Sequence, residues 1–416
     1  MLTHRVLAAL RFVLPVVILV AAEAPSAAIA GDWPQWRGVG RDGHSTDTGL
    51  LKAWPKGGPK LVWKITGVGI GYSSLAVADG RIYTLGDGKD RSALVAMDLD
   101  GKRLWSTPIG KTGGNYAGTR STPTVDGALV YALGQFGDLV CADAKTGAEK
   151  WRRNLEKEFA GQVGGWNYAE SPLVDGNLLV CAPGGSRGAV VALDKMTGQA
   201  VWRTEDYKDH AEYTSIIAAE IGGQKQYVHF SDQNLVGISP DTGRVLWSVK
   251  RQGSTAVITT PIVADNMVYV TSGYGVGCNL FKISKSGSKF VAEQLYEGKD
   301  MVNHHGGVVK VGDYVYGYSD GKGWVCQEFK SGAMKWKSKE LGKGSIAYAD
   351  GMLYLRSEDG KGTVALVEAT PDGWREKGRF DQPDRSGQNS WSHPVIANGR
   401  LYLRDMDVLL AYDVKA

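Results

Sequence analysis

One sequence unit recurs through most of the 416-residue chain, and this repeat restricts the fold more than any other feature. Each copy has a short apolar run, an Asp-Gly or similar turn, a second run that usually contains Tyr, and a third run that leads into D-x-x-T-G-x-x-x-W. The fullest copies are Thr122–Trp151 and Ser171–Trp202. Short apolar runs separated by such turns predict antiparallel hairpins, because Asp-Gly supplies the positive φ that tight hairpin turns require. The repeat therefore predicts consecutive four-stranded antiparallel sheets.

The tryptophans that end the motif give the length of the unit. In the first half of the chain they follow one another at intervals of 42 to 51 residues, about the length of four strands with their turns. One four-stranded sheet cannot bury both of its faces, whereas a ring of sheets can, and a ring leaves few free edges. We therefore expect a structural role, covering the face of the neighbouring sheet, for Trp63, Trp105, Trp151, Trp202, Trp247 and Trp336.

Counting the units predicts how the ring closes. Eight units begin at Ser74, Thr122, Ser171, Ser215, Thr260, Gly306, Ser345 and Trp391. The last unit ends after its third strand, and Leu61-Val62-Trp63 is a fourth strand without a sheet of its own. The sequence therefore predicts an all-β, eight-bladed β-propeller of four-stranded antiparallel blades, closed by an N-terminal strand that completes the last blade. This single domain spans residues 60–416, after a leader segment at 31–59.

Residues 1–30 predict an export signal. Arg5 and Arg11 form a positive start, Phe12 to Ala22 is an apolar stretch, and Ala28-Ile29-Ala30 predicts cleavage after Ala30. The alternative is a membrane anchor, but the uncharged stretch is short for a span of about 20 residues. We expect a monomer without a membrane span after cleavage, in the periplasm or outside the cell.

Charge and cysteine content exclude other classes. The chain has 48 Lys+Arg and 44 Asp+Glu, and it contains no basic block, so we do not expect a nucleic-acid partner. Four widely separated cysteines form no C-x-x-C zinc or redox motif. Export permits disulfides, but Cys141 and Cys326 fall in the repeat position that holds Ala96, Ala192 and Gly237 elsewhere. That position favours small buried side chains, and hence free thiols.

The copies of D-x-x-T-G-x-x-x-W resemble the pyrroloquinoline-quinone (PQQ)-type propeller repeats and their tryptophan-docking motif, over roughly residues 60–416. The runs Trp33–Gly38 and Asn303–Gly307 are also similar to exported bacterial repeat proteins. The resemblance implies a propeller and leaves two functions open. One branch of the family consists of quinone-dependent dehydrogenases, and another of non-enzymatic scaffolds of envelope assembly.

Polar and aromatic residues are concentrated at one predicted rim. In a propeller, the segments before the inner strands and those between the second and third strands project on one face. This rim includes Tyr116, Tyr274, His305 and His393. Its stacking and hydrogen-bonding groups suit a polar or sugar-like ligand, unless the rings only fill the channel. The expected ligand-binding residues are Arg120, Trp166, Asn167, Tyr168, Glu170, Tyr213, Asn303, His304, Asn389 and Trp391.

A smaller set has chemistry suited to catalysis or metal binding. The candidate catalytic residues are Glu170, His304 and Asp232, and the candidate metal ligands are Glu170 and Asn234. Glu170 would be a cation ligand, a base or a hydrogen-bonded structural residue. Adjacent side chains of an extended segment point to opposite faces, so we expect at most one of His304 and His305 to face the channel.

These residues lead to three functional hypotheses. The first is an exported propeller without enzymatic activity that binds a protein, peptide or carbohydrate at its funnel face. The second is an alcohol or sugar oxidoreductase that uses PQQ and Ca²⁺, two cofactors implied only by the family resemblance. The adjacent cysteine pair of many quinoprotein alcohol dehydrogenases does not occur in this sequence. The third is a hydrolase or lyase that uses Glu170 and a rim histidine.

Overall fold

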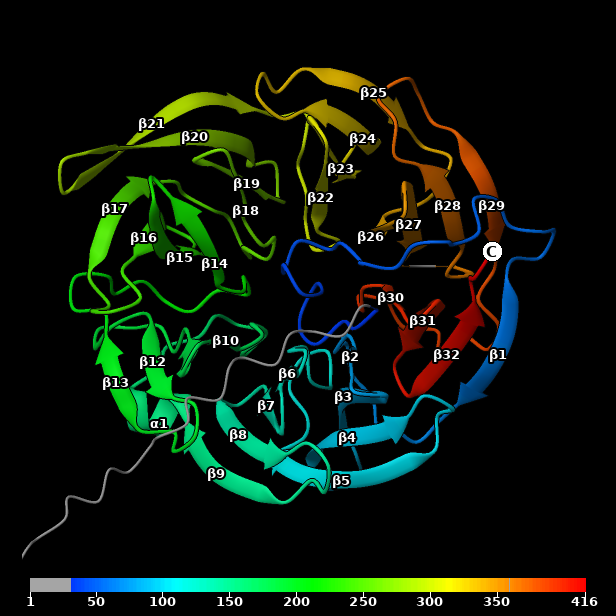
Figure 1. Ribbon diagram of the computed structural model, residues 1–416, viewed down its shortest axis with the longest axis horizontal. Coiled ribbons are helices and arrows are strands. Elements are labelled where there is room, and N and C mark those ends of the chain that lie inside the picture. Colours follow the sequence, from blue (N-terminus) through cyan, green and yellow to red (C-terminus); the bar gives the residue numbers. More distant parts are fainter. Residues whose placement is uncertain (1–30, 359) are drawn as a thin grey trace, which may run out of the picture.

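The computed structural model describes residues 31–358 and 360–416, so the predicted export signal lies outside the described residues. The chain forms a ring of eight four-stranded antiparallel sheets around a central axis (Figure 1). The predicted all-β, eight-bladed propeller is confirmed. The described residues contain no helix with the length and apolar character needed to cross a bilayer.

The first four blades follow one another in the sequence, each with its first strand innermost (Figure 1). Blade 1 contains β2 (Ala76–Ala78), β3 (Arg81–Asp87), β4 (Ser92–Asp98) and β5 (Arg103–Gly110). Blade 2 contains β6 (Thr124–Asp126), β7 (Leu129–Leu133), β8 (Asp138–Asp143) and β9 (Glu149–Asn154), followed by the short helix α1 (Leu155–Phe159). Blade 3 contains β10 (Leu173–Asp175), β11 (Leu178–Cys181), β12 (Val191–Asp194) and β13 (Ala200–Arg203). Blade 4 contains β14 (Ile217–Ile221), β15 (Gln224–Phe230), β16 (Asn234–Ile238) and β17 (Val245–Lys250).

The other four blades complete the circle. Blade 5 contains β18 (Ile262–Ala264), β19 (Met267–Ser272), β20 (Gly277–Ser286) and β21 (Lys289–Gly298). Blade 6 contains β22 (Val308–Val311), β23 (Tyr314–Ser319), β24 (Gly323–Glu328) and β25 (Met334–Ser338). Blade 7 contains β26 (Gly344–Ala349), β27 (Met352–Ser357), β28 (Val364–Glu368) and β29 (Glu376–Phe380). Blade 8 contains β30 (Val395–Ala397), β31 (Arg400–Asp405), β32 (Val408–Asp413) and, as its outer strand, β1 (Lys60–Ile65).

The ring closes as the strand count predicts. β1 pairs antiparallel with β32, with Trp63 opposite Ala411 and Ile65 opposite Leu409. The N-terminal strand therefore completes the sheet formed by the last three strands of the chain (Figure 1). Segments from the two ends of the described chain thus stabilise one blade jointly.

Neighbouring blades are joined by a tryptophan that lies over a glycine. The indole Nε1 of Trp151 donates to the carbonyl of Lys195 in the next blade at 3.0 Å. A Cβ on Gly198 in the same turn would lie 2.7 Å from the Trp151 ring, and Gly198 has a φ of +68°. The Thr-Gly turn thus needs glycine for its conformation and for close approach of the ring. Equivalent indole-to-carbonyl bonds join Trp63 to Leu99, Trp105 to Ala144, Trp202 to Pro240 and Trp336 to Thr370.

Blade 5 departs from this pattern because it has no D-x-x-T-G turn. The indole N–H of Trp247 stays in its own blade and donates to Gln226 at 2.7 Å. The long hairpin of β20 and β21 packs Phe290 against blade 4 instead. Tyr296 takes the tryptophan position, and its hydroxyl donates to the Phe329 carbonyl of blade 6 at 2.8 Å. An aromatic ring therefore still joins blades 5 and 6 after the motif is lost.

The strand register explains the small residues of the repeat. Cys141 lies opposite Trp151, and Cys326 lies opposite Trp336. Ala96, Ala192 and Gly237 occupy the same position opposite their own tryptophans. Cys141 and Cys326 are free and buried, as expected from that position, and Cys181 and Cys278 are also free and buried.

The leader segment fills the central channel, a placement that the sequence did not predict. Figure 1 shows it crossing the middle of the ring. Trp33 pairs with Val77, and His44 pairs with Tyr348, so both lie close to Asp-Gly turns at one end of the channel. Arg41 lies between these two residues in the sequence and donates to the carbonyl of Ser171 at 2.6 Å. Ser171 precedes the inner strand β10, at the other end of the channel. The leader therefore enters from the turn-bearing face, and its tip reaches the funnel face.

The closure of the ring can be tested by truncation. Deleting residues 31–64 removes the leader and most of β1, and so exposes a strand edge in blade 8. We expect the truncated protein to aggregate or to lose its cooperative unfolding transition, as measured by light scattering and calorimetry. A monomeric product with an unchanged melting temperature would contradict this closure.

The role of the interblade tryptophans is testable by unfolding in denaturant. Trp151→Ala and Trp202→Ala should each lower the free energy of unfolding by about 3–5 kcal/mol, as large aromatic truncations in a core do. The control is Val201→Ala on the same strand as Trp202, where the side chain is 55% exposed. We expect that control to change stability by less than about 0.5 kcal/mol. Equal effects of the three substitutions would refute an interblade role.

Candidate functional site

A cavity of about 190 Å³ lies on the axis at the funnel face. Most of its wall is aromatic, and the rings come from the leader and from segments that precede several blades. The cavity is lined by Trp36, Tyr72, Tyr116, Arg120, Trp166, Ala169, Tyr213, Ser215, Ala256, Ile258, Tyr274, His304, His305, Trp391 and His393. Trp36 belongs to the leader tip and donates its indole N–H to Thr260 at 3.0 Å. The leader thus supplies part of the cavity wall.

The structure brings half of the predicted ligand-binding residues together. Arg120, Trp166, Tyr213, His304 and Trp391 all line the cavity. The other half do not line the cavity: Asn167, Tyr168, Glu170, Asn303 and Asn389.

Tyr168 and Asn303, two of the remaining five, bond to backbone or side-chain groups of neighbouring segments. The hydroxyl of buried Tyr168 donates to the Pro183 carbonyl at 3.0 Å. The amide of buried Asn303 accepts from Thr259 at 2.8 Å and donates to the Tyr318 carbonyl at 2.9 Å. Both side chains stabilise the loops behind the cavity wall.

The prediction that His304 and His305 point to opposite faces is wrong. Both residues line the cavity, and their ring centroids are 4.7 Å apart. They lie in an irregular segment before β22, which begins only at Val308. The alternation of side chains along a strand therefore does not apply to them.

Glu358 fixes the proton of His305. Its carboxylate accepts from His305 Nε2 at 2.6 Å and from Trp391 Nε1 at 2.8 Å. Burial raises the pKa of Glu358, but the bond from His305 and the charges of His305 and Lys343 outweigh burial and hold this pKa below its usual value. Glu358 is therefore an anion that favours a proton on His305 Nε2. Within the described residues, His305 Nδ1 is buried and has no hydrogen-bond partner.

His393 and His304 are neutral. His393 Nε2 lies 3.1 Å from the His305 carbonyl, which can only accept a hydrogen bond. Burial, with the charge of Arg37, lowers the pKa of His393 to about 3, and its Nδ1 has no partner among the described residues. His304 Nδ1 accepts from Lys343 Nζ at 2.8 Å. Burial and the charges of His305 and Lys343 lower the pKa of His304 to about 4, which leaves its proton on Nε2.

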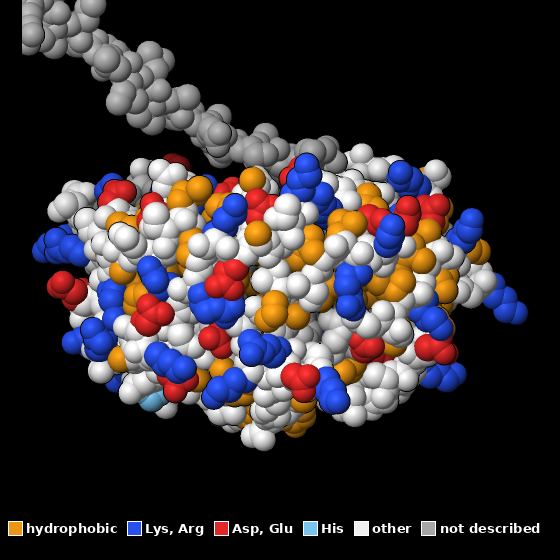
Figure 2. All heavy atoms as spheres, turned by 90° about the horizontal axis from the view of Figure 1, so that it is seen from below, with side chains coloured by type: hydrophobic (Ala, Val, Ile, Leu, Met, Phe, Trp, Pro, Cys, Tyr) orange, Lys and Arg blue, Asp and Glu red, His pale blue; other side chains and the backbone are white. Residues whose placement is uncertain are grey.

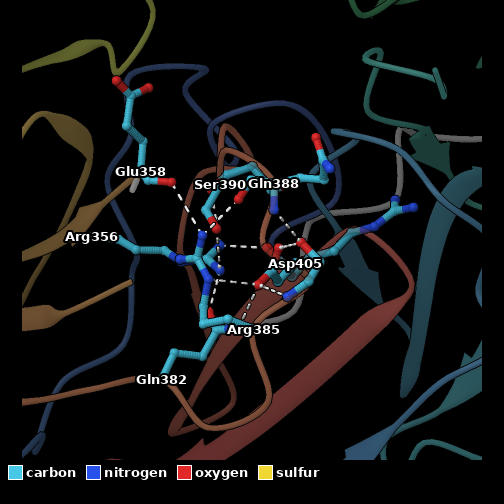
Figure 3. Close-up of polar contacts among 10 residues, drawn as sticks. Arg356, Glu358, Gln382, Arg385, Gln388, Ser390 and Asp405 are labelled. Carbon is cyan, nitrogen blue, oxygen red and sulfur yellow. Dashed lines mark hydrogen bonds and ion pairs between the residues drawn. The ribbon is translucent and has the colours of Figure 1, made fainter. Parts of the chain in front are cut away.

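A buried polar network positions Trp391 and Glu358 (Figure 3). Arg356 donates to Ser390 at 3.1 Å and to Gln382, both from the segment that leads to Trp391. Asp405 on β31 accepts from Gln382 at 3.1 Å and pairs with Arg385 at 2.9 Å. The Ser390 N–H donates to the Glu358 carbonyl at 2.8 Å. The sequence alone does not reveal this network, because its members come from separate strands and loops.

Glu170, the candidate for most chemical roles, lies away from the cavity. It is buried, and its Oε1 accepts from the Ala182 N–H. Burial raises the pKa of Glu170 to about 8, although the Ala182 N–H and the charge of Arg41 oppose the shift. Asn234 donates instead to Asp209 at 2.8 Å. The two candidate metal ligands therefore do not share a site.

The residues do not fit a calcium–PQQ site of the kind that the resemblance implies. Calcium takes six to eight oxygen ligands, mostly carboxylates and carbonyls. None of the residues that line the cavity is a carboxylate. Among the described residues, no group of three or more His, Cys, Asp or Glu side chains could hold a metal ion. We derive no chemistry through PQQ for this chain.

A second hollow of about 400 Å³ lies where blades 4 and 5 meet. It is lined by polar groups without an aromatic ring, and Arg251 in its wall already donates to Asn279 at 2.9 Å and to the Gly277 carbonyl at 2.6 Å. The side of the ring shown in Figure 2 has interspersed basic and acidic side chains. The funnel cavity is the better candidate site.

Comparisons with known proteins identify similar repeats. A family model described as outer membrane protein assembly factor BamB matches residues 90–294. The curated protein of that name from Burkholderia pseudomallei is 31% identical over 193 residues, 44% of this chain and 45% of the relative. The one from Salmonella typhimurium is 26% identical over 214 residues, 49% of this chain and 48% of the relative. The aligned part thus spans about half the length of these relatives.

Solved structures with low sequence identity share the fold. BamB from Moraxella catarrhalis superposes with a TM-score of 0.63 at 16% identity, over 85% of this chain and 99% of that one. The quinohemoprotein alcohol dehydrogenase from Comamonas testosteroni gives a TM-score of 0.65 at 13% identity, over 93% of this chain and 81% of that one. At such identities these similarities concern the fold alone.

The protonation of Glu170 can be tested through pH-dependent stability. Its raised pKa means that the folded state binds more protons than the unfolded state between about pH 4.5 and 8. Its contribution to stability is therefore present below pH 4.5 and is lost as the pH rises to 8. Glu170→Gln cannot titrate, so its free energy of unfolding should rise relative to wild type across this range, by about 1.4 kcal/mol per unit of pKa shift. A constant difference in urea unfolding from pH 4 to 9 would contradict the shift.

Proposed function

Because the chain is a β-propeller of the PQQ-like repeat family, we propose that it is a binding module that takes its ligand at the funnel face. The observation that carries this proposal is the axial cavity, which gathers seven aromatic rings from the leader and several blades. Aromatic walls with a few polar groups are typical of ligand sites. The ring closure and the leader together give these side chains fixed positions.

The size of the cavity limits what can enter it. Pockets for drug-sized ligands have volumes of about 300–1,000 Å³, and a cavity of roughly 150 Å³ is known to hold one benzene ring. The volume here is about 190 Å³. It therefore suits one ring-sized group at the end or side of a larger ligand, with the rest of that ligand lying over the funnel.

The relatives support a location for this module. Their name assigns them to outer membrane protein assembly. We propose export by the signal at residues 1–30, a leader at 31–59, a propeller domain at 60–416, and a monomer that acts in the cell envelope on a protein, peptide or carbohydrate. The alternative oxidoreductase has less support, since its cofactor ligands do not converge at the cavity.

Site-specific crosslinking tests whether ligand binds at the funnel face. Tyr116 is 53% exposed at the cavity rim, whereas Lys145 is exposed in a turn on the opposite face. With a photoreactive phenylalanine at position 116, we expect adducts in envelopes of the native host that do not form from position 145. Adding Trp391→Ala should reduce the adducts from position 116 at least tenfold, because it removes part of the cavity wall. Equal adducts from both positions, or no effect of Trp391→Ala in a folded protein, would refute the proposal.

A further inference from the structure

The second hollow, at the seam between blades 4 and 5, has a surplus of positive charge. Three cationic side chains line it: Lys250 at the end of β17, Arg251 directly after it, and Lys299 directly after β21. One carboxylate, that of Glu297, lies in the same wall. Within the described part of the chain, none of these four side chains forms an ion pair. The wall therefore carries an excess of two positive charges.

Arg251 is buried, and the groups that bind its guanidinium are neutral. The residue is only 5% exposed, and its guanidinium donates to the Asn279 side chain at 2.9 Å and to the Gly277 carbonyl at 2.6 Å. It also donates to the hydroxyl of Ser272. Hydrogen bonds to amide, carbonyl and hydroxyl oxygens do not cancel a full positive charge, and a buried charge without a counter-ion is costly. An anion in the hollow would lower that cost.

The other buried arginines of the described chain each have a carboxyl group close by. Burial lowers the pKa of Arg37, and the charge of Asp42 opposes that shift. Burial and the charge of Asp405 act in the same two ways on Arg356. Burial also lowers the pKa of Arg251 to about 10, but the groups that oppose this shift are a thiol and a phenol. Among the described residues, Arg251 is therefore the buried arginine for which no carboxylate acts as a counter-ion.

Lys299 has a fixed position at the same wall. Its ammonium group donates to the carbonyls of Gly275 at 2.7 Å and Val276 at 2.6 Å, in the turn between β19 and β20. These carbonyls orient the ammonium group without cancelling its charge. Blade 4 supplies Lys250 and Arg251, and blade 5 supplies Lys299, so both blades contribute cations where β17 lies beside the β20–β21 hairpin (Figure 1). A low-dielectric wall that carries mainly one sign of charge concentrates ions of the opposite sign.

The size and the charge of the hollow indicate the class of anion. Its volume of about 400 Å³ lies within the range of about 300–1,000 Å³ for ligand pockets. A phosphate monoester has a charge of about −1.5 to −2 at pH 7 and three acceptor oxygens, so it matches an excess of two positive charges better than a carboxylate does. Its oxygens also suit guanidinium and ammonium donors.

We infer that this hollow is a second ligand site, which binds a phosphate monoester group between Lys250, Arg251 and Lys299. Two sources carry such a group: a small phosphorylated molecule and the headgroup of a lipid such as phosphatidic acid. The inference goes beyond the proposed binding at the funnel face and does not depend on it, since the hollow and the funnel cavity share no lining residue.

The test is calorimetric titration of the full exported chain with methyl phosphate and, as a singly charged probe, acetate. We expect methyl phosphate to bind at one site per chain and acetate to bind at least tenfold more weakly. Binding to vesicles that contain phosphatidic acid, but not to vesicles of phosphatidylcholine alone, would identify a lipid headgroup as the source. Without vesicle binding, the source is a small phosphorylated molecule. If neither methyl phosphate nor phosphatidic acid binds, or if acetate binds as tightly, the inference is overturned and the proposed function stays intact.

The double variant Lys250→Gln, Lys299→Gln tests the site through two exposed side chains. Arg251 stays intact, because its bonds to Asn279 and Gly277 hold the seam together. We expect the double variant to bind the phosphate probe at least tenfold more weakly, because it removes two of the three cations. Unchanged affinity in this variant would place the bound phosphate elsewhere and overturn the inference.

Glu297→Gln removes the carboxylate from the wall and gives a result that a loss of folding cannot imitate. Its affinity for the phosphate probe should rise about threefold or more, because a like charge no longer repels the anion. Lys145→Gln is the matched control, since Lys145 is an exposed lysine in a turn on the opposite face. Its affinity should equal that of wild type. Unchanged or weaker binding to Glu297→Gln would contradict the placement of the anion against this wall.

Discussion

The structure depends on an indole ring that covers a glycine turn in the next blade. Each blade alone would expose one apolar face of its sheet, and this contact covers that face while its N–H satisfies a turn carbonyl. Trp151 and Gly198 show why the two residues must occur together, since a Cβ at Gly198 would meet the ring at 2.7 Å. The contact recurs between most neighbouring blades, so that the blades together form one closed ring. Where the glycine turn is lost in blade 5, a long hairpin and Tyr296 provide the contact instead.

Closure of the ring is also what creates the site. The cavity residues come from segments hundreds of positions apart, such as Tyr72 and Trp391, whose rings are 4.6 Å from each other. The pairing of β1 with β32 and the bonds from Ser392 and His393 to Ser73 and Ser74 hold those two segments together. The leader then enters the channel and adds Trp36 to the wall. Ring closure therefore determines both the stability of the fold and the geometry of the site. A change that loosens blade 8 would lower the stability and also displace the cavity residues.

The fold could be predicted because its information is local and repeated. Turn residues, strand spacing and the small residue opposite each tryptophan, such as Cys141 opposite Trp151, can all be found in a single unit. The site could be predicted only in part. The rim position of Trp166 and Trp391 could be predicted, but not which rim side chains line the cavity, and Glu170 and Asn303 from the same rim do not line it. Trp36 was missed because nothing local indicates that a segment before the first blade will fill the channel.

The buried arginines explain the polarity of the channel. The inner strand of each blade is an edge strand, and its outer carbonyls have no ladder partner. The segments that lead into these strands also have free carbonyls, and arginine, with five donors in a planar fork, can satisfy several of them at once. Arg41 bonds to the carbonyls of Ser171 and Pro172, and Arg404 bonds to those of Ser73 and Gly69. Because carbonyl dipoles rather than carboxylates hold these arginines, positive charge remains near the axis. Burial, together with the charge of Arg37, keeps the nearby imidazole of His393 neutral.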